Sequence, residues 1–158
     1  MNIAYYHIIL CHVPLIGMAF AMLLNIWALL KKSTDIKYAS LSLYVLSAII
    51  SIPVYFTGDG AEQIVKTIPG ITETLIEPHE KMALYFFIGL AIIGVISIIG
   101  LIIEKKYKIL FHKIIFVVII LAFLSSFFAV KTALSGGKIR HNEIEFKTDT
   151  LKLAPDND

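Results

Sequence analysis

The sequence predicts an all-α protein, an integral membrane four-helix up-down bundle. Hydrophobic residues make up 58% of the 158-residue chain. They gather in four runs of about 20 residues, the length that crosses the hydrocarbon core of a bilayer. The polar connections between these runs are mostly short, which favours antiparallel neighbours. The chain is therefore expected to form one bundle whose first partner is the lipid bilayer, and no nucleic-acid partner is expected.

The four predicted spans are residues 8–30, 39–56, 83–103 and 109–134. Pro14 lies in the first span, where it removes a backbone donor and is expected to kink the helix or mark its start. The second span is expected to stop at Gly58-Asp59-Gly60. The fourth is expected to end near Leu134, where two glycines would turn the chain out of the membrane. The expected division is a bundle over residues 1–135 and a polar, outward-facing C-terminal tail over residues 136–158.

The connection over residues 58–81 is expected to be partly helical. Residues 61–68 mix apolar and polar side chains in a way that suits a short amphipathic helix at the membrane interface, and Pro69-Gly70 would end it. A second helix is expected to begin at Thr72, a suitable N-cap. Pro78 interrupts the helical pattern just before the third span.

Lysines cluster in the two short connections. Lys31, Lys32 and Lys37 surround the first connection, and Lys105, Lys106, Lys108 and Lys113 surround the second. Only Asp35 and Glu104 of the twelve acidic residues lie among them. By the positive-inside rule, both connections face the cytoplasm. The expected location is the bacterial inner (cytoplasmic) membrane, with both termini and residues 58–81 outside.

Four of the five histidines are expected to meet on the outer side: His7, His12, His79 and His141. Imidazole nitrogens bind haem iron and transition metals, and helical bundles often hold such sites between facing helices. His12 and His79 form the best opposed pair and are the expected axial ligands of a haem iron. His7 lies on a different face of a regular helix from His12. His7 and His141 could complete a second pair, close a separate metal site, or bind nothing.

Carboxylates allow a different site at the same end. Glu62, Glu77 or Glu80 could join one or two histidines around an iron, zinc or copper ion. A structural interpretation competes with both sites, because a histidine at a membrane interface is more often an amphipathic anchor than a ligand. An ion path is disfavoured, since no ionisable group lies near the predicted midplane.

Residues 7–14, HIILCHVP, resemble the opening His-Pro-x-x-Val-His-Phe-Pro signature of a bacterial four-helix membrane family of unknown function. The likeness continues through Thr57-Gly58, His79 and Gly136-Gly137 with His141, and it covers the chain to about residue 144. Ile8, Cys11 and Val13 depart from the signature. The resemblance implies a four-helix membrane protein with outward histidines and a haem-binding role like that of a b-type cytochrome.

The leading hypothesis is a b-type cytochrome-like electron-transfer protein that holds haem b near the outer face. It would act as a subunit of a redox complex rather than as a stand-alone enzyme. The expected partner is a membrane or periplasmic redox protein, and a quinone is a further candidate. The alternatives are a non-haem metal-binding or sensing membrane protein with His and Glu ligands, and an accessory subunit without a cofactor. The chain has no Cys-x-x-Cys-His motif, which excludes covalently attached c-type haem.

Overall fold

The fold is a bundle of four α-helices. The computed structural model describes the backbone of residues 2–153 and the side chains of residues 2–142. Its helices are α1 (Ile3–Lys31), α2 (Thr34–Val65), α3 (Glu73–Ile103) and α4 (Lys108–Leu153). The described residues contain no strand, and each helix is long and apolar enough to cross a membrane. The predicted all-α four-helix bundle is confirmed.

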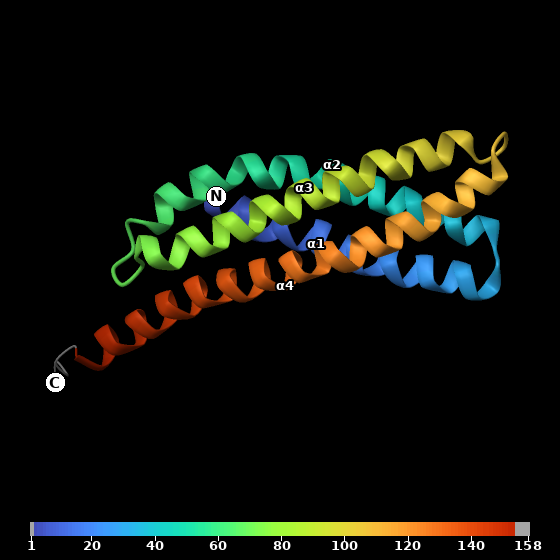
Figure 1. Cartoon of the computed structure of the whole chain (residues 1–158). Coiled ribbons are helices and arrows are strands. Elements are labelled where there is room, and N and C mark those ends of the chain that lie inside the picture. Colours follow the sequence, from blue (N-terminus) through green and yellow to red (C-terminus); the bar gives the residue numbers. More distant parts are fainter. Residues whose placement is uncertain (1, 154–158) are drawn as a thin grey trace.

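Successive helices run in opposite directions, so the bundle has two chemically distinct ends (Figure 1). The N-terminus, the α2–α3 connection and the C-terminal part of α4 lie at one end, which we call the histidine end because it holds His7 and His79. The α1–α2 and α3–α4 connections lie at the other, which we call the lysine end. The main helix contacts are α1 with α2, α3 with α4, and α2 with α3.

Local sequence determines where the helices begin. The side chains of Asn2 and Ser33 accept hydrogen bonds from backbone N–H groups three residues later, at 3.1 and 3.4 Å, which is ordinary N-capping. Thr72 is the N-cap of α3, as predicted. Pro69 and Gly70 lie in the α2–α3 connection, where Gly70 has a φ of 84° that favours glycine.

Several predicted helix boundaries are wrong. α1 begins at Ile3 and continues through Pro14, so Pro14 does not mark the start of the helix, and α3 includes Pro78. α2 does not stop at Gly58 but continues to Val65, so most of the predicted separate helix over residues 61–68 is the last part of α2. α4 continues through Gly136 as far as Leu153, so the predicted tail is helical over 136–153, and residues 154–158 lie outside the described residues.

The glycines that suggested helix stops are contact points between helices. A Cβ on Gly60 would lie 2.8 Å from the side chain of Ile3, and a Cβ on Gly136 would lie 3.1 Å from Cε1 of His79. Glycine within a helix costs about 1 kcal/mol relative to alanine. Close packing against the neighbouring helix requires the missing Cβ here, so the helix continues through these positions.

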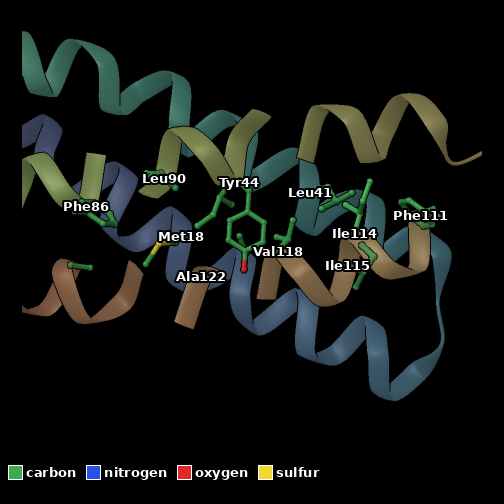
Figure 2. Packing of buried hydrophobic residues seen from close by; sticks show 13 residues of the cluster. Met18, Leu41, Tyr44, Phe86, Leu90, Phe111, Ile114, Ile115, Val118 and Ala122 are labelled. Carbon is green, nitrogen blue, oxygen red and sulfur yellow. The ribbon is translucent and has the colours of Figure 1, made fainter. Parts of the chain in front are cut away.

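The apolar core runs along the bundle interior between the four helices (Figure 2). Tyr44 of α2 is fully buried and reaches toward Val118 and Ala122 of α4 (Figure 2). Many large apolar side chains point outward instead, among them Phe20 and Trp27, which are 58% and 53% exposed. Such an apolar exterior is what contact with lipid requires.

The buried positions reveal that α1–α2 and α3–α4 are two copies of one helical hairpin. Six buried residues of α1 correspond to six buried residues of α3 at a constant shift of 72 positions. They are Ala4, Pro14, Met18, Ala21, Asn25 and Ala28 in α1, and Ile76, Phe86, Leu90, Ile93, Ser97 and Gly100 in α3. Because α1 and α3 run in the same direction, the two hairpins form a parallel repeat.

The buried positions of α2 and α4, the second helices of the two hairpins, match at a shift of 78 positions. Five buried residues of α2 correspond in order to five buried residues of α4. They are Lys37, Ser40, Tyr44, Ser47 and Ser51 in α2, and Ile115, Val118, Ala122, Ser125 and Ala129 in α4. The packing within each hairpin corresponds as well. A Cβ on Gly17 would collide with the hydroxyl of Ser47, and a Cβ on Gly89 would collide with the hydroxyl of Ser125.

Candidate functional site

His7 lies in the second turn of α1, and its ring is held by α2. Its Nδ1 lies 3.1 Å from the carbonyl oxygen of Val54 and 3.2 Å from the hydroxyl of Thr57. A backbone carbonyl can only accept, so Nδ1 must carry the proton in that bond. In the neutral ring Nε2 then keeps its lone pair, which makes it the atom able to bind a metal.

His79 lies in the second turn of α3 and is held by α4 in the same way. Its Nδ1 lies 3.1 Å from the carbonyl oxygen of Thr132 and 3.3 Å from the hydroxyl of Ser135. The same reasoning puts the proton on Nδ1 and the lone pair on Nε2. Both histidine side chains are half-buried.

The two histidines occupy equivalent positions in the repeat. His79 follows His7 by 72 residues, the shift that relates α1 to α3. The residues around the two rings are related by the shift of 78 residues between α2 and α4. Val54, Thr57 and Gly58 correspond in order to Thr132, Ser135 and Gly136. We call each set of carbonyl, hydroxyl and glycine a histidine cradle. The chain thus builds the same cradle twice.

The two equivalent histidines lie at the same end of the bundle, each in the second turn of its helix. No other histidine has a histidine at the equivalent position. His12 corresponds to Leu84, His112 to Thr34 and His141 to Gln63. The repeat therefore singles out His7 and His79 as a pair.

His12 and His141 lie on the surface of the bundle. The side chain of His12 is exposed, and its Nδ1 lies 2.7 Å from the carbonyl oxygen of Ile8, in its own helix. His141 is exposed on α4. The sequence-based choice of His12 as the partner of His79 differs from the pair that the repeat singles out, because His7 is hydrogen-bonded to the neighbouring helix and His12 to its own.

Of the predicted carboxylates, Glu62 belongs to a polar network at the α2–α3 edge of the histidine end. Glu80 is exposed on α3. Lys66 pairs with Glu62 at 2.5 Å and with Glu73 at 3.0 Å, and these carboxylates raise the pKa of Lys66. Glu77 is exposed. Within residues 2–142, no three His, Cys, Asp or Glu side chains gather in a way that could hold a metal ion.

The two cradles offer two imidazole donors, with no third His, Cys, Asp or Glu gathered beside them in the described residues. A b-type haem can be held by two imidazoles, whereas a protein zinc site usually takes three or four side-chain ligands. A backbone carbonyl on Nδ1 is the usual second-shell partner of a metal-binding histidine, since it fixes the ring and its tautomer. His7 and His79 each have such a partner.

No known protein family, curated protein or solved structure matches the chain. The resemblance of residues 7–14 to a membrane-protein signature therefore stays a prediction. The function must be inferred from the two cradles and the bundle that positions them.

Proposed function

We propose that the protein is a membrane b-type cytochrome-like electron-transfer protein in which His7 and His79 hold haem b. The observation that carries this proposal is the pair of equivalent imidazoles, each with Nδ1 bound by a backbone carbonyl and Nε2 left as the electron-pair donor. When bound, the haem would supply an iron that accepts and releases single electrons. The protein would supply the two ligands and their orientation.

The residues of each cradle have separate roles in this proposal. The carbonyl oxygens of Val54 and Thr132 fix the ring planes and make Nε2 more basic. The hydroxyls of Thr57 and Ser135 add a second contact to each Nδ1. Gly136 leaves room for the ring of His79, since a Cβ there would lie 3.1 Å from Cε1, whereas a Cβ on Gly58 would lie 3.7 Å from Cε1 of His7, an ordinary contact. The cradles therefore position the ligands before any cofactor binds.

An absorption spectrum of the purified protein, oxidised and then reduced, tests this function. The proposal predicts the sharp reduced bands of a six-coordinate b-type haem. A colourless preparation that holds one equivalent of iron, zinc or copper by elemental analysis would instead support the non-haem metal protein. A preparation with neither cofactor, even after incubation with haem, would support the accessory subunit.

We further propose that the histidine end faces the outside of a bacterial inner membrane, because seven lysines surround the connections at the opposite end. A periplasmic or membrane redox protein would then exchange electrons there, with a quinone as a further candidate. A reporter enzyme fused after Asp158 should be active only in its exported form. Activity of a cytoplasm-only reporter at that position would reverse the orientation.

A further inference from the structure

The lysine end contains a buried ammonium group. Lys37 of α2 is 3% exposed, and its Nζ lies 3.1 Å from Nε2 of His112. Nδ1 of His112 donates to the carbonyl oxygen of Lys108 at 2.7 Å, so Nε2 accepts from Lys37. Lys37 forms no ion pair with any residue from 2 to 142. A buried charge without a counter-charge is costly, so an anion bound near this end would stabilise it.

The acidic residues of this end do not supply that counter-charge. Only Asp35 and Glu104 lie among the seven lysines. Glu104 accepts a hydrogen bond of 2.5 Å from the hydroxyl of Tyr38. Neither acid forms an ion pair with a lysine in the part of the chain whose side chains are described. The lysine end therefore carries an excess of positive charge.

A shallow hollow of about 360 Å³ opens where His112 meets the surface of α4. Its wall consists of Lys108, His112 and Lys113, together with Ile109 and Phe116. Ile109 and Phe116 are 79% and 55% exposed on the outer surface of the helix. A second hollow of about 510 Å³ shares Lys108, Ile109 and Lys113 and adds Lys105 and Lys106. Cationic side chains and apolar surface thus meet at one place on the bundle.

We propose that this hollow binds an anionic phospholipid, with the phosphate near Lys108 and Lys113 and the acyl chains along Ile109 and Phe116. Lys37 lies behind His112 and stabilises the bound anion. Basic pockets at the cytoplasmic ends of membrane helices are suited to anionic head groups. A lipid would place its acyl chains on the apolar surface of the hollow and its phosphate among the neighbouring lysines, whereas a free phosphate ion would leave the apolar surface uncovered. This proposal does not depend on haem binding at the opposite end.

Native mass spectrometry of the full-length protein, taken from bilayers with equal phosphatidylglycerol and phosphatidylcholine, tests the site. The wild type should retain several-fold more phosphatidylglycerol than phosphatidylcholine. Lys37→Met and Lys113→Gln should each reduce this ratio several-fold. Lys37→Met is expected to fold, because replacing a buried charge with an apolar side chain of similar volume is often neutral or stabilising. Circular dichroism of each variant checks the fold.

Lys31→Gln with Lys32→Gln is the matched control, since it removes charge from the same end but away from the hollow. It should leave the lipid ratio unchanged. An equal loss in this control would assign the preference to general surface charge and overturn the site. The proposal would also be overturned by equal retention of both lipids in the wild type. Complete displacement of the lipid by millimolar inorganic phosphate would identify a phosphate-ion site instead.

Discussion

Alanine at His7 should abolish the six-coordinate haem spectrum, and alanine at His79 should do so to the same extent. The two rings occupy equivalent cradles, so losing either leaves the iron one axial ligand short. Haem occupancy should fall by more than the roughly 10- to 100-fold that is typical of losing a second-shell partner. The measurement is haem content per protein, together with the reduced absorption bands, after purification in the same detergent.

The other histidines provide the controls for this prediction. His12→Ala and His141→Ala remove exposed rings, and His112→Ala removes a ring at the opposite end. All three should retain the six-coordinate haem. If His12→Ala lost the haem while His7→Ala kept it, the pair proposed from the structure would be wrong, and the pair chosen from the sequence would be restored.

Gly136→Ala should weaken haem binding although it changes no ligand. The added Cβ would lie 3.1 Å from Cε1 and 3.3 Å from Nδ1 of His79, closer than ordinary contact. The ring must move by a few tenths of an ångström, which disturbs its hydrogen bond with the carbonyl oxygen of Thr132. We expect a loss of affinity of about 10-fold, at the lower end of second-shell effects, measured by haem titration of the apoprotein.

Gly137→Ala is the matched control, because a Cβ on Gly137 meets nothing within 4 Å. Both substitutions should favour the helix by up to about 1 kcal/mol, so a general effect on α4 would appear in both. Gly58→Ala should have a small effect, since its Cβ would lie 3.7 Å from Cε1 of His7, an ordinary contact distance. Equal affinities in the variants at 136 and 137 would contradict the role of the cradle.

The fold could be predicted from the sequence because its signals are local. Four long apolar runs separated by polar connections are sufficient to indicate four antiparallel spans. Helix ends were harder to predict, since a glycine favours both a helix stop and a close approach of two helices. Gly60 and Gly136 serve the second purpose. Which purpose applies depends on the neighbouring helix, and local sequence does not contain that information.

The site could be predicted only in part. The position of His79 near the end of a span is visible in the sequence, but which of His7 and His12 is hydrogen-bonded to α2 is not. The sequence contains one signal that relates His7 to His79. A histidine followed ten residues later by glycine occurs twice, at His7 and at His79. A serine followed ten residues later by a hydroxyl residue and glycine also occurs twice, at Ser47 and at Ser125. These pairs are hard to recognise because most other equivalent residues differ.

The repeat also makes the surroundings of the two rings unequal in charge. Glu62 of α2 and Arg140 of α4 occupy equivalent positions in the two hairpins. One flank of the histidine pair therefore carries an acid where the other carries a base, although the cradles themselves match. Glu62 is itself paired with Lys66 at the end of α2, so this flank carries an ion pair rather than an isolated acid. The repeated hairpin plan thus gives two nearly identical histidine cradles in different charged surroundings.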